Sequence, residues 1–244
     1  MPKRRIKIKN YLIFILIVSS VTLSYFYSRE VYTFFMRSYY EKIRGRSIEQ
    51  QLSRAREMYR NREYTELEEY LRTLIIVYPE NRDLRKLEGL TLIKLGKRDR
   101  GVDMILTAGG DEPMPEVQLE ETVSALFEQK RYGDIAEIFK KNSPGANPNL
   151  LYYYGVSLFE TEKYAGSTRY LKRAIEEGRR DYKVYHYIGR AYVASGDTRA
   201  SLPYLDRARN LNVEDPDVAN SLAGAYQKLG RYDDAARILR KMKR

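Results

Sequence analysis

The sequence predicts an all-α chain in which one membrane-spanning helix precedes an α-solenoid of about six helical hairpins. Two observations predict this fold class. An uncharged apolar stretch lies near the start of the chain, and a period of about 34 residues recurs from residue 48 to residue 244. Hydrophobic residues make up 43% of the 244 residues and charged residues 32%, which is typical of a folded chain.

The cysteine and histidine content limits the chemistry of the chain. It contains no cysteine and one histidine, His186. Disulfides, thiolate zinc sites, cysteine nucleophiles and paired-histidine metal sites are therefore excluded. Gly89 and the pair Gly96-Lys97 lack the spacing of a phosphate-binding loop. We expect no enzymatic activity, no metal and no cofactor.

Residues 10–28 form an uncharged segment of 19 residues. At about 1.5 Å per residue, a helix of this length just crosses a hydrocarbon core of roughly 30 Å. Tyr11 and the aromatic residues 25–27 lie where side chains meet the membrane–water boundary. We predict a transmembrane helix in contact with membrane lipid. A cleaved signal peptide is the alternative, since residues 18–20 resemble a small-residue cleavage site.

The charged residues on either side of this segment predict its orientation in the membrane. Residues 1–9 form a basic tail with five Lys or Arg and no acid, which predicts a cytoplasmic N-terminus. We expect a single-pass protein of the inner (cytoplasmic) membrane whose remaining residues lie in the periplasm. Residues 29–47 mix aromatic and basic residues, so the far side is basic as well. They predict either a juxtamembrane helix on the membrane or on a partner, or a plain helical stalk.

From residue 48 onward, small residues recur in the middle of apolar helices at intervals of 34, 34, 32, 34 and 34: Ala55, Gly89, Val123, Gly155, Gly189 and Ala223. A second series places a large apolar residue in a second helix: Leu71, Ile105, Phe139, Leu171, Leu205 and Leu239. A polar turn separates the two helices, and Gly96, Gly196 and Gly230 suit the left-handed backbone common at helix ends. Each unit is predicted to be a helical hairpin that is stable only when stacked on its neighbours.

These units resemble the tetratricopeptide repeat, a helical hairpin of 34 residues. Two units carry the best matches: Tyr185, Ile188, Gly189, Tyr192, Leu205 and Ala208, then Leu222, Ala223, Tyr226, Gly230, Tyr232, Ala235 and Leu239. The resemblance covers residues 48–244 and predicts six units at residues 48–81, 82–115, 116–147, 148–181, 182–215 and 216–244. The small residue lets the two helices of a unit approach, and the large residues fill the seams between units.

Two places depart from this pattern. Arg85 and Glu88 stand where bulky apolar residues are expected, and residues 109–113 read Gly-Gly-Asp-Glu-Pro, so we predict a second unit that is either irregular or locally loose. The third unit ends early at residues 142–148, which predicts a hinge between two halves of three units each.

The resemblance implies a superhelix whose concave side is lined by the first helices and binds peptides or helices. The corresponding positions form the predicted groove: Tyr152, Tyr153, Phe159, Lys183, His186, Tyr187, Arg190, Asn220 and Gln227. This mixture of aromatic, amide and basic side chains suits an extended segment that carries acidic residues. Alternatively, several of these tyrosines pack in the seams, since the chain contains 23 of them.

The end of the chain predicts a second surface. Arrays of this family usually finish with an extra helix over the last hairpin, whereas this sequence stops at Arg244. We expect a C-terminal partner face at Ile238, Leu239 and Met242. Another protein, or a second copy through self-association of the uncapped repeat, would cover it.

The resemblance also implies a function in protein–protein interaction. We predict a membrane-anchored scaffold that holds other proteins in a bacterial envelope assembly, such as a secretion, outer-membrane, cell-wall or periplasmic flagellar collar complex. The alternative is a membrane-bound chaperone or targeting receptor that binds client peptides transiently in the groove. Of the net charge of +11, five charges lie in residues 1–9, and the remaining +6 is interleaved with acids. We therefore expect no binding to nucleic acid.

Overall fold

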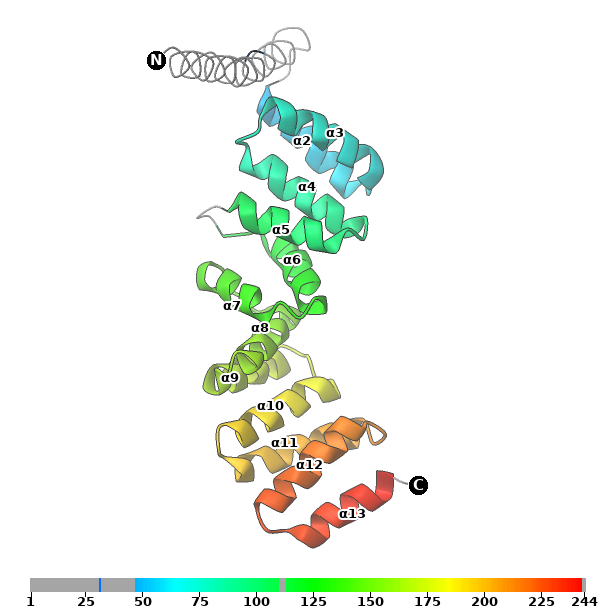
Figure 1. Ribbon diagram of the computed structural model, residues 1–244, viewed down its shortest axis with the longest axis vertical. Coiled ribbons are helices and arrows are strands. Elements are labelled where there is room, and N and C mark those ends of the chain that lie inside the picture. The colour runs from blue at the N-terminus through cyan, green and yellow to red at the C-terminus, as the bar shows by residue number, and fades with distance from the viewer. Residues whose placement is uncertain (1–30, 32–46, 110–112, 243–244) are drawn as a thin grey trace, which may run out of the picture. The chain divides into compact units, whose positions relative to one another are not determined.

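The computed structural model describes residue 31, residues 47–109 and residues 113–242, the side chains of residues 241 and 242 excepted. Within these residues it contains twelve α-helices and no strand (Figure 1). The helices are α2 (Ile48–Arg60), α3 (Tyr64–Val77), α4 (Arg82–Lys94), α5 (Arg98–Ala108), α6 (Glu116–Glu128), α7 (Tyr132–Lys141), α8 (Pro148–Glu160), α9 (Tyr164–Glu176), α10 (Tyr182–Ala194), α11 (Thr198–Leu211), α12 (Pro216–Lys228) and α13 (Tyr232–Met242).

The first helix of each pair begins where a polar side chain caps it. In five of the six pairs, an oxygen of this side chain accepts a hydrogen bond from a backbone N–H of the first turn: Ser47, Asn81, Asn147, Asp181 and Asp215. Helix α6 is the exception, because Pro115 precedes it and makes no such bond. A cap replaces a missing intrahelical partner and stabilises the helix by about 1 kcal/mol.

The turn inside each pair has a left-handed residue at the same repeat position. Backbone φ is positive, between 56° and 92°, at all six of these residues: Arg62, Gly96, Lys130, Glu162, Gly196 and Gly230. The three glycines therefore adopt the conformation that the sequence predicts for them. The other three residues adopt it at a steric cost, because their Cβ approaches the backbone.

Close approach of the two helices of a pair depends on the small residue of the first. A Cβ at Gly155 would lie 2.7 Å from Leu171 Cγ, and a Cβ at Gly189 would lie 2.5 Å from Leu205 Cγ. Both leucines are fully buried. The predicted role of the small residue is confirmed at these two glycines, because no larger side chain fits without movement.

The second pair is regular, and the prediction that it is loose was wrong for its described residues. A Cβ at Gly89 of α4 would lie 2.6 Å from the carbonyl oxygen of Gly101 in α5, so the two helix backbones are in close contact. Glu88 is 5% exposed and lies 4.0 Å from Arg100. Its buried charge therefore has an opposite charge beside it. Residues 110–112, which belong to the glycine-rich part of this prediction, lie outside the described residues.

The chain forms two compact units, Met1–Gly109 and Gly110–Arg244. The predicted hinge at residues 142–148 is not the boundary between them, because α7 packs against α8 across that segment. Asn142 ties the segment down: its Oδ1 accepts a hydrogen bond from the Met114 backbone N–H at 2.7 Å, and its Nδ2 donates to the Ile138 carbonyl at 2.8 Å. The shortened third unit therefore keeps its neighbours in contact.

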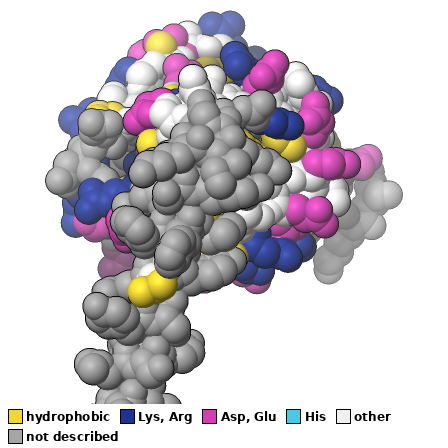
Figure 2. All heavy atoms as spheres, turned by 90° about the horizontal axis from the view of Figure 1, so that it is seen from above, with side chains coloured by type: hydrophobic (Ala, Val, Ile, Leu, Met, Phe, Trp, Pro, Cys, Tyr) yellow, Lys and Arg dark blue, Asp and Glu magenta, His cyan; other side chains and the backbone are white. Residues whose placement is uncertain are grey.

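The predicted membrane segment, residues 10–28, lies outside the described residues, as do residues 1–9 and most of residues 29–47. Among the helices that the structure describes, none combines the length and the apolar character needed to span a bilayer. On the face drawn in Figure 2, Lys and Arg side chains are interspersed with Asp and Glu.

Candidate interaction face

The nine predicted groove residues lie on α8, α10 and α12, which are successive first helices of the second compact unit. Helix α10 contacts both α8 and α12. Tyr152 and His186 are buried, at 3% and 8% exposure. The other seven are half-buried or exposed, and we name them the interaction face: Tyr153, Phe159, Lys183, Tyr187, Arg190, Asn220 and Gln227.

Aromatic rings form a continuous row from α6 to α10. Phe127 of α6 lies 4.7 Å from Tyr153 and 5.8 Å from Tyr152, measured between ring centroids. Tyr187 of α10 lies 6.2 Å from Tyr152 and 5.5 Å from Phe159. All four of these pairs are tilted or edge-to-face, which is the favoured geometry of aromatic contacts. Burial raises the pKa of Tyr187 further above neutral pH, and its hydroxyl is a neutral group that can donate a hydrogen bond.

Arginine side chains cover parts of this row. The Arg190 guanidinium lies 4.5 Å from the ring centre of Phe159 and 5.1 Å from that of Tyr187. A guanidinium stacked in this way keeps its N–H groups at its edge, where they can donate to a carbonyl or a carboxylate. The half-buried rings and this cation together form a surface for an extended chain with acidic or aromatic side chains.

Tyr152 belongs to the seam between units, so its assignment to an open groove requires correction. The Arg179 guanidinium lies 3.7 Å from the centre of the Tyr152 ring, and its Nε lies 2.9 Å from Asp181 Oδ2. Arg179 and Asp181 come from the loop before α10, the first helix of the next pair. Burial raises the pKa of Tyr152. The alternative that some tyrosines serve as seam packing therefore describes this residue.

His186 is also a seam residue. Its Nε2 is hydrogen-bonded to Ser221 Oγ of α12 at 2.8 Å. Burial, reinforced by the nearby Arg190 charge, lowers the pKa of His186 to about 4, so the imidazole is neutral at neutral pH. His186 therefore joins α10 to α12 and offers little surface to a partner.

Comparison with known proteins agrees with the repeat geometry. Residues 188–244 match the family model of the tetratricopeptide repeat. These residues are tetratricopeptide repeats. No curated protein matches the sequence.

Solved structures extend the likeness to the fold of more of the chain. MamA AMB-1 is 15% identical, with a TM-score of 0.53 over 65% of this chain and 95% of that one. MamA MSR-1 is 15% identical, with a TM-score of 0.55 over 66% and 94%. YrrB, described as a TPR protein with an unusual peptide-binding site, is 10% identical, with a TM-score of 0.57 over 75% and 95%. The predicted all-α tetratricopeptide-type solenoid is thereby confirmed for the described helices.

Sequence reasoning missed two residues at the aromatic row: Phe127, which belongs to it, and Arg179, which lies over the Tyr152 ring. The tetratricopeptide period holds the signal for Phe127, which occupies the same repeat position as Phe159. Both rings lie 5.7 Å from the tyrosine that opens the second helix of their own repeat, Tyr132 or Tyr164. No period marks Arg179, because its contact with Tyr152 depends on the path of a loop.

The residues of the predicted C-terminal partner face lie on α13, in the last described repeat. Ile238 and Leu239 are partly buried against the apolar cluster that contains Leu205 and Leu222. The side chain of Met242 lies outside the description. That a partner protein or a second copy covers this face stays a prediction.

Proposed function

We propose that the chain is a membrane-anchored tetratricopeptide scaffold that holds partner proteins in a bacterial envelope assembly through its interaction face. The observation that supports this proposal most directly is the row of half-buried rings and stacked guanidinium on α8 and α10. Rings of this kind give a partner a large contact area at a low entropic cost, because few bonds must be immobilised. The proposal assigns no catalytic step to the chain.

The composition of the interaction face supports a peptide segment as its occupant. Lys183 and Arg190 supply positive charge, and the exposed amides of Asn220 and Gln227 can each donate and accept hydrogen bonds with a peptide backbone. YrrB, which shares the fold, is described as having a peptide-binding site. We propose an extended segment with acidic side chains as the bound element.

The membrane tether in this proposal rests on the uncharged residues 10–28 and on the basic residues 1–9 before them. It places the repeats in the periplasm, where secretion, outer-membrane, cell-wall and flagellar collar assemblies are found. Alkaline carbonate extraction of membranes from cells that make the full chain tests the tether. Protease added to spheroplasts tests the orientation. Release of the intact chain by carbonate, or protection of the repeats from the protease, would contradict these two parts.

Site-specific photocrosslinking in intact cells tests the interaction face. A photoreactive amino acid replaces Asn220 or Lys183 on the face, and in a matched control it replaces Arg169, an exposed residue of the second helix α9. We expect discrete protein adducts from the two face positions that diminish when Arg190→Ala is added. Arg190→Ala leaves the buried seam residues in place.

The pattern of adducts separates the two candidate functions. A scaffold with a fixed partner gives one or two strong adducts that persist after cell growth stops. A chaperone or receptor gives many weak adducts that a competing peptide removes. Equal labelling from Arg169 and from the face positions, unaffected by Arg190→Ala, would refute the proposed interaction face.

A further inference from the structure

An open pocket of about 560 Å³, called the cavity below, lies on the surface of the first compact unit among helices α3, α4 and α5. Its apolar walls include Ile75 of α3 and Met104 of α5, and its polar lining includes Glu88 of α4 and Arg100 of α5. It is separate from the interaction face, which belongs to the second unit. Two buried glutamates near this cavity differ in how fully they are paired.

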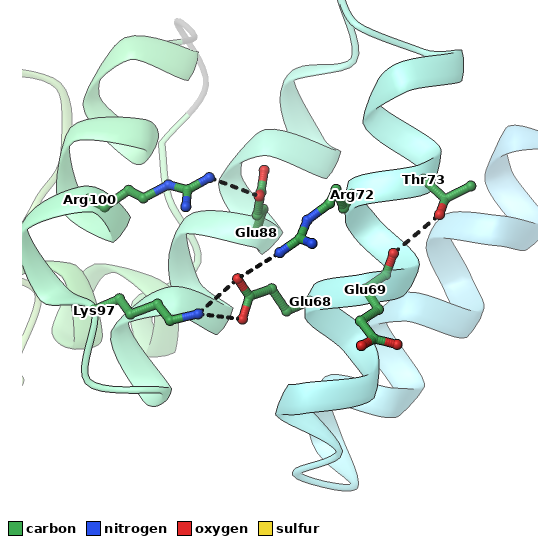
Figure 3. Close-up of polar contacts among 7 residues, drawn as sticks. All are labelled: Glu68, Glu69, Arg72, Thr73, Glu88, Lys97 and Arg100. Carbon is green, nitrogen blue, oxygen red and sulfur yellow. Dashed lines mark hydrogen bonds and ion pairs between the residues drawn. The ribbon is translucent and has the colours of Figure 1, made fainter.

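Glu68 is the fully paired carboxylate. Its two oxygens accept hydrogen bonds from Lys97 Nζ at 2.9 Å and 2.7 Å, and Arg72 lies 3.4 Å away on the other side (Figure 3). The side chain of Glu68 is only 10% exposed. The hydrogen bond from Lys97 lowers the pKa of Glu68. One lysine and one arginine together thus compensate this buried charge.

Glu88 has one cation nearby, but no described lysine or arginine donates a hydrogen bond to it. Its side chain is 7% exposed, and the nearest cation is Arg100 at 4.0 Å, which is too long for a hydrogen bond. No described residue donates a hydrogen bond to its carboxylate. Burial raises the pKa of Glu88. Its oxygens are not among the buried polar atoms that lack a partner, so the carboxylate reaches the solvent of the cavity, where a donor can approach it.

The geometry assigns this cavity to a lysine side chain presented by a partner protein, with its ammonium against Glu88 beside Arg100. The bound lysine would repeat at Glu88 the arrangement that Lys97 and Arg72 form at Glu68. Its four-carbon stem would lie along the apolar walls of Ile75 and Met104.

The other charges of the cavity do not reverse this assignment. Arg85 and Asp103 lie at its rim with opposite charges, and both are exposed to solvent. Arg100 repels a second cation, but its side chain is 63% exposed and is therefore screened. Arg72 and Arg85 also act on Glu88, but only through longer-range attraction. Among the charged residues that line the cavity, Glu88 is the buried one, and no described residue donates a hydrogen bond to it.

A titration followed at Met104 tests the assignment. The full chain contains six methionines, so methyl-¹³C methionine labelling gives few NMR signals, and Met104→Leu identifies the signal of the cavity. The protein is kept in an uncharged detergent. The probe is n-pentylamine, which reproduces the stem and ammonium of lysine; 1-pentanol and pentanoate are the controls. We expect a saturable shift of the Met104 signal with the amine, a weaker one with the alcohol and none with pentanoate.

Three variants decide whether Glu88 carries the binding. Glu88→Gln should weaken amine binding about tenfold, because the charge-assisted hydrogen bond is lost. Glu57→Gln, an exposed glutamate of α2, should leave it unchanged. Arg100→Ala should tighten amine binding by removing the competing cation, and this result is informative even where Glu88→Gln fails to fold. Tighter binding of pentanoate than of the amine, a Met104 signal that the amine leaves in place, or weaker amine binding in Arg100→Ala would overturn the proposal.

Discussion

The contact between Gly189 and Leu205 predicts that one added methyl group destabilises the solenoid. In Gly189→Ala, the new Cβ would lie 2.5 Å from both Cγ and Cδ2 of Leu205. Ordinary carbon contacts are at least about 3.5 Å, so these atoms must separate by about 1 Å. Leu205 is fully buried and cannot swing into solvent, so the shift has to involve the helices.

Two opposing effects set the size of the change. Alanine stabilises a helix interior by about 1 kcal/mol relative to glycine. Overpacking of a buried contact costs about 1–3 kcal/mol. We therefore expect Gly189→Ala to lower the free energy of unfolding by up to about 2 kcal/mol.

Gly224 is the matched control, because it lies inside α12 and a Cβ there would meet nothing within 4 Å. Gly224→Ala should raise the free energy of unfolding by about 1 kcal/mol. The gap between the two variants, about 1–3 kcal/mol, isolates the cost of overpacking.

The assay is urea denaturation of the full chain, followed by circular dichroism at 222 nm. A double-mutant cycle with Leu205→Val sharpens it, because valine removes one carbon from the side chain that the new Cβ meets. Leu205→Val should cost less in the Gly189→Ala background than in the wild type, with a coupling of about 0.5 kcal/mol or more. Equal stabilisation by Gly189→Ala and Gly224→Ala, or strict additivity in the cycle, would refute the packing argument.

Three further predictions follow from burial, backbone conformation and charge. The pKa of His186 is about 4 instead of 6.5, so between these pH values only the unfolded chain takes up the proton. The free energy of unfolding should therefore fall by about 3 kcal/mol at most as the pH drops from 6.5 to 4. Urea titrations at a series of pH values should show a smaller pH dependence in His186→Asn. Lys130 has a backbone φ of 56°, so Lys130→Gly should raise the free energy of unfolding of the protein by about 0.5–1 kcal/mol. Lys163 has a φ of −90°, so the control Lys163→Gly should lower it. Unchanged thermal midpoints in both variants would contradict this prediction. Lys97→Met removes two hydrogen bonds from buried Glu68 and should lower the free energy of unfolding by about 1 kcal/mol in the same denaturation assay. Adding Glu68→Gln to this variant should recover most of that loss, because the neutral amide carries no charge that needs a partner.

Local features of the sequence predict the helical hairpins. The residues that cap the first helices, such as Asn147 and Asp181, precede them in the sequence and act within one turn. Gly196 and Gly230 take the left-handed conformation that their place after a helix suggests. The small residues at Gly155 and Gly189 mark the close approach of two helices, because the period repeats the same packing requirement in each unit.

The candidate sites were less predictable, because burial depends on what the next repeat covers. Tyr152, His186 and Asn220 occupy the same repeat position, yet the first two are buried and the third is exposed. Arg179, from the loop that leads to the next repeat, covers Tyr152, and Ser221 of the following repeat covers His186. A pattern of residue types along one chain does not contain these contacts.

The amino-acid sequence alone determined that this part of the chain consists of paired helices, since caps, turn residues and periodic small side chains act over a few residues. The tertiary structure alone decided which charged side chains lie next to one another. Glu68 and Lys97 are 29 positions apart, and Glu88 and Arg100 come from different helices. These residues come close because their helices stack. The interaction energy of such a pair depends on the distance between the two charges and on how far water is excluded from them.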